Sequence, residues 1–291
     1  SDAEDHDLIK GIIPEQMWTT EAARGVRVIA GINGEFYTQE GPEGYMIKDG
    51  SSVINGTRIS SDEITYPFHG FFGVTKEESG LPPFVIGTYD EDWNTYKDSL
   101  LQATGGQFIL NRGNNIPYYG DLIECIEGEK NYDQETFYRY RNRHPRTAMG
   151  FDTDNNVYMV VVDGRQGDYA AGMLIDELAE LMKFLGCTVS INMDGGGSST
   201  AVAHLPVHVE NPIEGDGGEN YEDYTSIYYL INHPNNTNKD NPYYGDIRLR
   251  KVFSSVLIAE KKHVITELPM LTIPDAGGTV SGQSESVSIE P

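Results

Sequence analysis

The segment from residue 157 to residue 193 constrains the fold most, because it alternates between two kinds of hydrophobic pattern. Residues 157–163 and 187–193 are short runs of apolar and β-branched residues, which are typical of buried strands. An apolar stripe at helical spacing lies between these two runs and predicts a helix there. Strand, helix and strand in this order predict a crossover, which is normally right-handed. With the other β-like segments, the pattern predicts a single α/β (α+β) domain with a central mixed β-sheet packed by helices. The apolar stripe at helical spacing within residues 172–186 consists of Leu174, Leu178, Leu181, Met182 and Leu185.

A glycine-rich stretch directly follows the second of these strands. Asp194 ends the apolar run, and glycines and hydroxyl residues follow it. Glycine lets the backbone come close to a ligand, and bare N–H groups beside hydroxyls suit an anion such as phosphate. The alternative is a glycine-rich hairpin turn that Asp194 caps. A short glycine run does not decide between the two interpretations.

Two motifs that precede this stretch favour a functional site. They are Arg146-Thr147-Ala148-Met149-Gly150 and Asp163-Gly164-Arg165. Together with the strand-Asp-Gly-Gly-Gly-Ser stretch, they resemble the phosphodiester glycosidase family, most sharply over residues 144–203 and more loosely over residues 29–258. The resemblance implies a hydrolase that cleaves the glycosidic bond of a sugar-1-phosphodiester. The sugar released would be of the N-acetylglucosamine type, from a phosphorylated sugar or polymer.

The resemblance also suggests which residues form the active site. Asp194 and Asp163 each end an apolar strand, and either is a candidate base, nucleophile or stabiliser of an oxocarbenium ion. Arg146 is the first choice for phosphate capture and Arg165 the second, because a guanidinium binds phosphate through two parallel hydrogen bonds. Each arginine has an ordinary alternative, an ion pair with one of the many carboxylates. The residues expected to bind substrate are Asn33, Gly34, His144, Arg165, Gly195, Gly196, Gly197, Ser198, Ser199 and Thr200.

Residues 33–36 depart from the pattern of the family at one position. The matching place in the family usually reads Asn-Gly-Gly-Phe, whereas this chain has Glu35 in place of the second glycine. If that glycine has a positive φ, Glu35 must strain or alter the loop. Glu35 is therefore a candidate catalytic carboxylate peculiar to this chain, with a solvated loop glutamate as the alternative. The departure also keeps open a non-catalytic protein that binds carbohydrate or a surface polymer.

The implied substrate sets the chemistry. The leaving group of a sugar-1-phosphodiester is a phosphate monoester, whose second pKa is about 6, so it departs without first taking a proton. A strong general acid is then less necessary than in ordinary glycoside hydrolysis, and capture of the phosphate charge matters more. A phosphodiesterase that cleaves the other ester bond is a further alternative.

Charge and composition limit the partners. Lys and Arg number 21 against 45 for Asp and Glu, which gives a net charge of −24. We therefore expect no nucleic acid as a partner. The partner that the resemblance implies is a small-molecule or glycan phosphodiester. No apolar run is long enough for a membrane span. The first residue, Ser1, suggests a processed chain, so we expect an extracytoplasmic protein, periplasmic, surface-exposed or secreted, after removal of a signal.

The sequence shows no pattern for a required cofactor. No histidine or cysteine spacing is typical of zinc, although a carboxylate-rich site would suit calcium or magnesium. Cys125 and Cys187 are interpreted as two free thiols, with a single disulfide as the alternative.

The rest of the sequence predicts the remaining elements. We expect residues 1–259 to form the catalytic domain and residues 260–291 a polar C-terminal tail. A helix is predicted over residues 14–24 and a hairpin over residues 45–55 that turns at Asp49-Gly50. Further strands are predicted over residues 26–32, 68–74, 84–89, 106–111, 147–151, 226–231 and 252–258. We also expect a short helix over residues 92–101 and loops over residues 210–223 and 232–246. Five tyrosines either stack on sugar rings or simply cover the edge of the core, namely Tyr118, Tyr119, Tyr132, Tyr138 and Tyr140.

Overall fold

The computed structural model describes residues 10–38, 41–55, 69–88, 92–111, 114–115, 142–204, 228–235 and 249–260. These residues belong to one compact unit, Ser1–Lys261. The five tyrosines named above, Cys125, the loops over residues 210–223 and 236–246, and the tail after Glu260 lie outside the described residues. The predictions made for them stay predictions.

A small antiparallel sheet contains the strand that leads into the first motif. It has four strands in the order β14-β13-β1-β15. The central strand β1 (Arg27–Asn33) pairs with β13 (Ala201–His204) on one side and with β15 (Ser255–Glu260) on the other, and β14 (Tyr228–Leu230) pairs with β13. Asn33 at the end of β1 therefore lies close to the start of β13, which follows the glycine-rich stretch.

A larger sheet carries the other motifs. Nine strands form it, in the order β11-β10-β12-β8-β4-β5, with β6 and β9 paired to β8 and β7 paired to β6. A separate two-stranded ribbon joins β2 (Tyr37–Thr38) and β3 (Gly41–Pro42). The strands of the larger sheet are β4 (Tyr45–Lys48), β5 (Ser51–Asn55), β6 (His69–Thr75), β7 (Phe84–Thr88), β8 (Leu100–Asn111), β9 (Asn114–Asn115), β10 (Arg146–Phe151), β11 (Val157–Val162) and β12 (Val189–Asn192).

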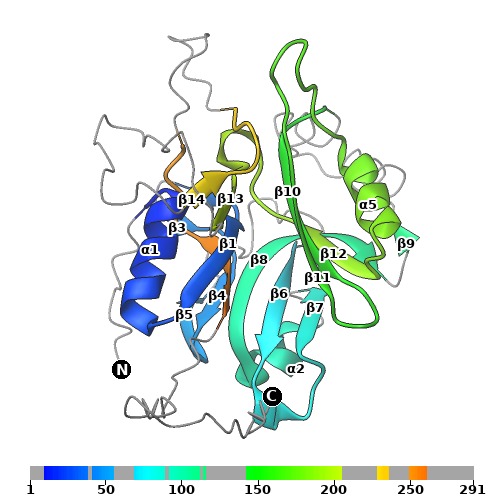
Figure 1. The fold of residues 1–291 in the computed structure, drawn as a ribbon. Helices are drawn as coiled ribbons and strands as arrows, with labels where there is room; N and C mark the ends of the chain where they lie inside the picture. The colour runs from blue at the N-terminus through cyan, green and yellow to red at the C-terminus, as the bar shows by residue number, and fades with distance from the viewer. Residues whose placement is uncertain are drawn as a thin grey trace, which may run out of the picture. The chain divides into compact units, whose positions relative to one another are not determined.

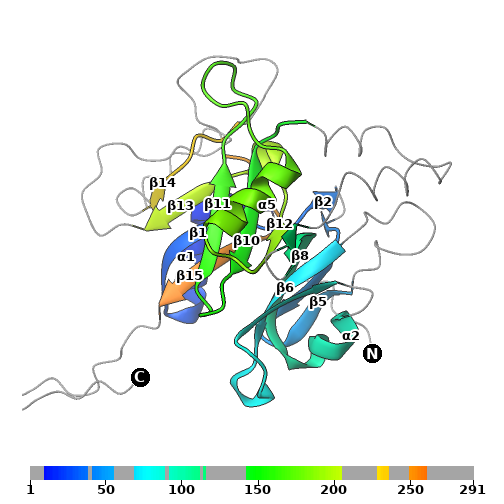
Figure 2. The same cartoon turned by 90° about the vertical axis from the view of Figure 1, so that its right-hand side faces the viewer.

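Helices pack on the two sheets (Figures 1 and 2). A hydrophobic core lies between the sheets. α1 (Ile13–Arg24) packs on the small sheet, and α5 (Ile175–Phe184) packs on the large one. The short helix α2 (Trp93–Tyr96) packs beside β6 and β8. The expected α/β class is confirmed. The core between the sheets is formed mainly by Ile32, Phe72, Phe108, Met149, Ile191 and Met193.

The predicted crossover through α5 is confirmed. β10 pairs antiparallel with both β11 and β12, so β11 and β12 run parallel to each other on either side of it. Every hydrogen-bonded pair among the described strands is antiparallel, and the parallel relation exists only between such non-adjacent strands. The buried face of α5 consists of Ile175, Leu178, Ala179 and Met182, so the stripe expected from leucines is centred closer to the start of the helix.

β8 differs most from the expected elements. The helix expected over residues 92–101 is shorter, because α2 ends at Tyr96, a 3-10 turn follows over Lys97–Ser99, and Leu100 already belongs to β8. β8 then continues through Gly106, where an added Cβ would lie 2.8 Å from the main-chain oxygen of Asn192. Glycine is needed here for close packing against β12, so the residue that suggests a strand boundary lies inside a strand.

The predicted helix and turn signals are confirmed. Pro14 lies in the first turn of α1, and Gly25 ends the helix with a left-handed φ of 63°. Asp49 and Gly50 have φ values of 54° and 74°, which are those of a tight hairpin turn between β4 and β5.

Cys187 is a buried free thiol. Burial is the main cause that raises its pKa to about 11, with a smaller contribution from the charge of Asp152. The thiol therefore stays protonated and serves as a small core side chain under α5.

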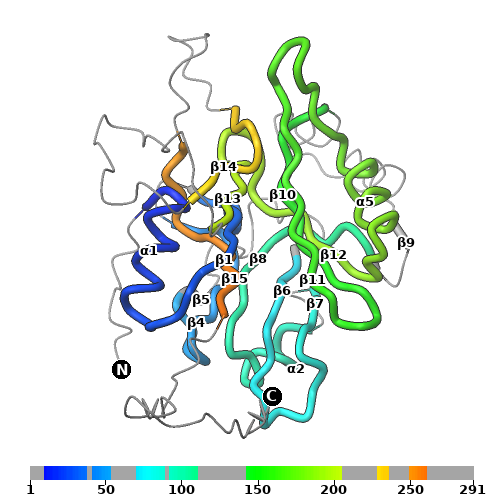
Figure 3. Tube along the Cα trace, viewed as in Figure 1, coloured from blue at the N-terminus to red at the C-terminus, as the bar shows by residue number. Residues whose placement is uncertain are grey.

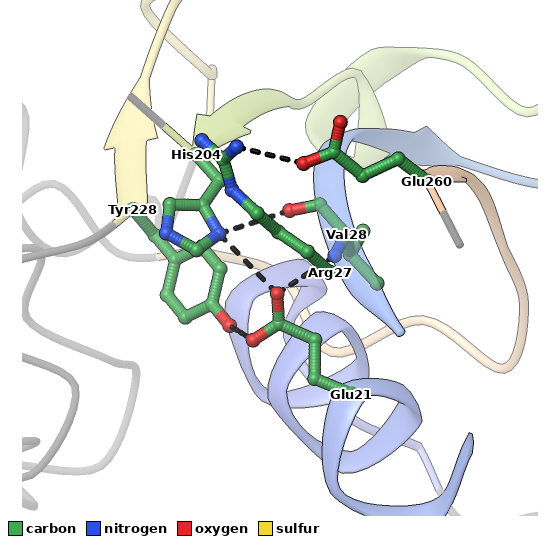
Figure 4. Close-up of polar contacts among 6 residues, drawn as sticks. All are labelled: Glu21, Arg27, Val28, His204, Tyr228 and Glu260. Carbon is green, nitrogen blue, oxygen red and sulfur yellow. Dashed lines mark hydrogen bonds and ion pairs between the residues drawn. The ribbon is translucent and has the colours of Figure 1, made fainter. Parts of the chain in front are cut away.

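Glu21 joins α1 to the small sheet (Figure 4). Tyr228 Oη donates to its Oε2 at 2.5 Å, and the N–H of Val28 donates to its Oε1 at 2.7 Å. His204 Nδ1 lies 3.3 Å from Oε1 and 3.0 Å from the carbonyl oxygen of Val28, so this nitrogen carries a proton between two acceptors. One partly buried carboxylate thus connects α1, β1, β13 and β14.

Replacing Glu21 by alanine should lower the free energy of unfolding by about 2 kcal/mol or more, because three donors lose a charged acceptor. Glu260→Ala is the matched control, since it removes a carboxylate whose 2.7 Å pair with Arg27 is exposed to solvent. That loss should stay within about 0.5 kcal/mol. Urea unfolding of both variants checks the prediction, and equal losses would contradict it.

Candidate functional site

The loop over residues 194–200 carries the chain from β12 in the large sheet to β13 in the small one, a path that can be followed in Figure 3. The N–H of Asp194 donates to Gly34 O at 3.1 Å, and the N–H of Gly196 donates to Pro145 O at 3.0 Å. The N–H of Asn33 donates to Thr200 O at 3.3 Å. The structure therefore brings together the motifs around residues 33, 146 and 194.

Asn33 holds this junction from inside. Its side chain is fully buried, and its Nδ2 donates to Asp194 O at 2.6 Å. Its Oδ1 accepts hydrogen bonds from Thr147 Oγ1 at 2.8 Å and from the N–H of Thr200 at 3.2 Å. Three of the four hydrogen bonds that an asparagine amide can form are thus made to the protein. The geometry suits a residue that positions the loop, and its contact with substrate stays a prediction.

The three glycines serve different purposes. The N–H of Gly196 is already bonded to Pro145, whereas the N–H groups of Gly195 and Gly197 meet no acceptor among the described residues. Gly196 has a φ of 65°, which strongly favours glycine. A Cβ on Gly195 would lie 2.7 Å from the main-chain oxygen of Pro145, so no side chain fits there. Two of the three expected N–H donors thus remain for an anion.

Arg165 lies against this loop. A Cβ on Gly196 would fall 3.0 Å from its Nη1, and its own φ of 56° is unusual for a residue with a side chain. Its Nε–H donates to His144 Nδ1 at 3.0 Å. His144 Nδ1 must therefore be an acceptor, which puts the proton of a neutral ring on Nε2. The predicted residues Arg165, His144 and Gly196 lie together.

Arg250 also lies next to the glycine loop, and no motif in the sequence indicated this. A Cβ on Gly197 would fall 2.6 Å from its Nη2 and 2.7 Å from its Cζ. No residue in the described part of the chain forms a hydrogen bond or ion pair with its guanidinium. Arg250 lies outside every motif, and its only signal in the sequence is a basic residue shortly before the last predicted strand.

Arg146 is oriented toward the main chain. Its side chain is 6% exposed, its Nε donates to Met173 O at 3.0 Å, and its Nη2 donates to Asn142 O at 3.1 Å. Both carbonyls belong to segments beside the start of β10 and α5. The Arg165 guanidinium lies against the glycine loop, and phosphate capture by Arg146 stays a prediction.

Asp163 is surrounded by donors. Its Oδ1 accepts from Asn232 Nδ2 at 2.8 Å, and the N–H of His233 lies 3.0 Å from both of its oxygens. Tyr169 Oη donates to Oδ2 at 3.3 Å, and the charge of Asp163 is the main cause that raises the pKa of Tyr169. Asn232 Nδ2 also reaches Ser199 O at 3.0 Å. Asp163 thus connects the end of β11 to residues 232–233 and, through Asn232, to the loop.

The hydroxyl groups of the loop are buried. Ser198 and Thr200 are 1% and 2% exposed, and their hydroxyl oxygens have no hydrogen-bond partner among the described residues. Ser199 Oγ lies within hydrogen-bond distance of Thr147 Oγ1, at 3.3 Å. Since buried polar groups are nearly always hydrogen-bonded, Ser198 and Thr200 have capacity for water or ligand.

Glu35 is buried, so the alternative of a solvated loop glutamate is wrong. It is 3% exposed, and its Oε2 accepts the N–H of Gly105 at 3.1 Å. Burial raises the pKa of Glu35 well above its usual range, and the N–H groups of Gly105 and Gly44 only partly oppose the shift. The expected strain is absent as well, because Glu35 does not have a positive φ.

Neither a metal cluster nor a membrane helix is found among the described residues. No group of three or more His, Cys, Asp or Glu side chains there could hold a metal ion. None of the described helices is long and apolar enough to cross a membrane.

Comparison with known proteins points to one family. Residues 26–237 match the family model described as phosphodiester glycosidase. The N-acetylglucosamine-1-phosphodiester alpha-N-acetylglucosaminidase of Mus musculus is 24% identical over 173 residues, which cover 58% of this chain and 31% of that protein. The enzyme of the same name from Bos taurus is 27% identical over 183 residues, which cover 62% and 32%. This chain spans about a third of the length of these curated relatives.

A solved structure shares the fold. It is the catalytic domain of zebrafish N-acetylglucosamine-1-phosphodiester alpha-N-acetylglucosaminidase, auto-inhibited by its pro-peptide. The TM-score is 0.57 at 20% identity, and the match covers 87% of this chain and 68% of that chain. At this identity the likeness shows the fold alone.

The raised pKa of Glu35 predicts a pH dependence of stability. The folded carboxyl binds its proton more tightly than the unfolded chain does, so its contribution to stability falls as pH rises above the ordinary value of 4.5. Glu35→Gln should therefore gain stability relative to the unmodified chain as pH rises from 5 to 8. Urea unfolding at both pH values measures this difference.

The matched control is Glu77→Gln, because Glu77 is exposed on a 3-10 turn. Its difference from the unmodified chain should be the same at pH 5 and pH 8. A Glu35→Gln difference that also stays constant would show that the carboxyl titrates as in the unfolded chain.

Proposed function

Because the chain belongs to the phosphodiester glycosidase family, we propose that it hydrolyses the glycosidic bond of a sugar-1-phosphodiester and releases an N-acetylglucosamine-type sugar. The observation that supports this most is the position of Arg165 against Gly196, two residues after Asp194. A cation for the phosphate then lies against the same short loop that carries a carboxylate for the anomeric carbon. The names of the mouse and cattle relatives support the choice of sugar.

We propose that Asp194 rather than Asp163 acts at the anomeric carbon. The oxygens of Asp163 accept bonds from Asn232, His233 and Tyr169, which suits a residue that holds the site together. The main chain of Asp194 is fixed at both its N–H and its carbonyl, which places its side chain. A carboxylate there stabilises the positive charge that develops on the sugar ring as the glycosidic bond breaks.

In this proposal the phosphate leaves with the bonding electron pair and no proton. A guanidinium compensates the charge on the departing oxygen better than an ammonium, because its planar fork matches two phosphate oxygens. Arg165 is in place for this role, and His144 holds its Nε. Arg146 supports the site through the segment before α5.

The test is hydrolysis of an N-acetylglucosamine phosphodiester followed by identification of the products. Free sugar and a phosphomonoester are expected, whereas sugar phosphate and an alcohol would indicate a phosphodiesterase. No product would leave only a carbohydrate-binding protein. A parallel reaction with chelator tests whether calcium or magnesium takes part, and we propose that turnover persists. The extracytoplasmic location is a proposal that rests on the sequence argument alone.

Asp194→Asn should lower kcat by a factor of about a thousand or more while the melting temperature changes little, because the amide keeps the shape but not the charge. Asp163→Asn is the comparison variant. It should lower the melting temperature, since an amide cannot accept from all of its present donors, and lower kcat less. Single-turnover rates and thermal unfolding of both variants measure the two effects. A near-normal kcat in Asp194→Asn would contradict the proposal that Asp194 acts at the anomeric carbon.

The pH profile should have one limb. If the departing phosphate needs no proton, the single-turnover rate should rise with pH through the ionisation of Asp194 and then stay level. Product release does not mask the chemistry under these conditions. An alkaline limb that disappears in Glu35→Gln or in a His144 variant would show that a general acid operates.

A further inference from the structure

Two arginines from distant parts of the chain lie on neighbouring glycines. Arg165 follows β11 and lies against Gly196, and Arg250 precedes β15 and lies against Gly197. Adjacent Cα atoms are about 3.8 Å apart, so the two guanidinium groups lie within roughly 12 Å of each other. Two like charges at this separation repel, and an anion between them would remove the repulsion.

The surroundings of Arg250 differ from those of other arginines in the molecule. Arg24, Arg27 and Arg143 each form an ion pair with a carboxylate. The Arg250 guanidinium has no such partner within the described residues, in a chain whose net charge is −24. This guanidinium lies against a loop that has two N–H groups and two buried hydroxyls without a hydrogen-bond partner among the described residues, which suits an anionic ligand.

The loop is shaped to let the guanidinium approach. Gly197 has no positive φ, so its backbone would accept a side chain. The space of that side chain is occupied by Arg250, whose Nη2, Cζ and Nε would lie 2.6, 2.7 and 3.0 Å from an added Cβ. The absence of a side chain at position 197 therefore lets Arg250 reach the loop backbone.

We propose that Arg165 and Arg250 together bind the phosphate of the substrate, and that Arg250 compensates the second negative charge, which exists only on the departing phosphate. This inference rests on the proposed function. The diester carries one negative charge. When the bond between the anomeric carbon and oxygen breaks, its electron pair stays on that oxygen and the phosphate carries two. Water supplies the new oxygen on the sugar, and its proton passes to solvent.

A consequence is a preference for the dianion. The charge of one arginine balances the single charge of a phosphodiester, whereas two arginines balance the double charge of a phosphomonoester or of inorganic phosphate at pH 8. The site should therefore bind inorganic phosphate more tightly than dimethyl phosphate, and turnover should be inhibited by its own phosphomonoester product. Interactions that strengthen as the charge develops raise kcat rather than lower KM.

The experiment is calorimetric titration of the full chain with inorganic phosphate and with dimethyl phosphate at pH 8. Arg250→Gln should weaken the binding of inorganic phosphate by about tenfold or more and the binding of dimethyl phosphate much less. Arg27→Gln is the control of equal charge change and should leave both affinities unchanged, because Arg27 pairs with Glu260 beside β15. Gly197→Ala keeps Arg250 but displaces its guanidinium, so it should reproduce the loss even if Arg250→Gln folds poorly.

The inference would be overturned if Arg250→Gln or Gly197→Ala bound inorganic phosphate as tightly as the unmodified chain does. It would also be overturned if the variants lost equal affinity for inorganic phosphate and for dimethyl phosphate. In the turnover assay Arg250→Gln should lower kcat more than it changes KM, and the reverse would also contradict the inference. Phosphate binding that depends on Arg250 without hydrolysis of the sugar phosphodiester would refute the proposed function and leave the two-arginine site standing.

Discussion

The buried amide of Asn33 is the interaction on which the site depends. Asn33 ends β1 in the small sheet, Thr147 lies on β10 in the large sheet, and both meet at Asn33 Oδ1. The same side chain holds the carbonyl of Asp194 and the N–H of Thr200, at the two ends of the glycine loop. A buried amide is costly unless its partners are in place, so the two sheets and the loop have one favourable arrangement.

Electrostatics in this chain act locally against the overall charge. With a net charge of −24, the molecule repels an approaching phosphodiester, so in the proposed function binding depends on the few arginines at the glycine loop. The fold keeps Arg165 in place through His144 and brings Arg250 from the segment before β15. The positive site is therefore built by packing the two sheets together rather than by a cluster of basic residues in the sequence.

Local patterns predicted the elements well. The stripe on α5, the caps of α1 and the turn at Asp49-Gly50 depend on contacts within a few residues, which periodicity and glycine or proline positions capture. The family motifs also indicated that Asp194 and Arg165 belong to one site, although Asp163 serves there as an acceptor for several donors.

The parts that sequence did not predict depend on distant neighbours. The burial of Glu35 requires β8 to pass beside it, and β8 itself continues through glycines that usually mark a boundary. Arg250 has no motif around it, and it reaches Gly197 because the segment before β15 is held by the bridge of Val252 to Gly11 and by the pairing of β15 with β1. The hydrogen bonds of Arg146 to main-chain carbonyls likewise depend on the packing of α5, which no spacing in the sequence reveals.

The most direct test of the account is hydrolysis of an N-acetylglucosamine phosphodiester in water enriched in ¹⁸O, followed by mass spectrometry of both products. Free sugar and a phosphomonoester also form if the phosphorus–oxygen bond on the sugar side breaks, so the products alone do not identify the bond. If Asp194 acts at the anomeric carbon, the label enters the hydroxyl of the sugar and the phosphomonoester stays unlabelled. Label in the phosphomonoester would show attack at phosphorus and would contradict the account.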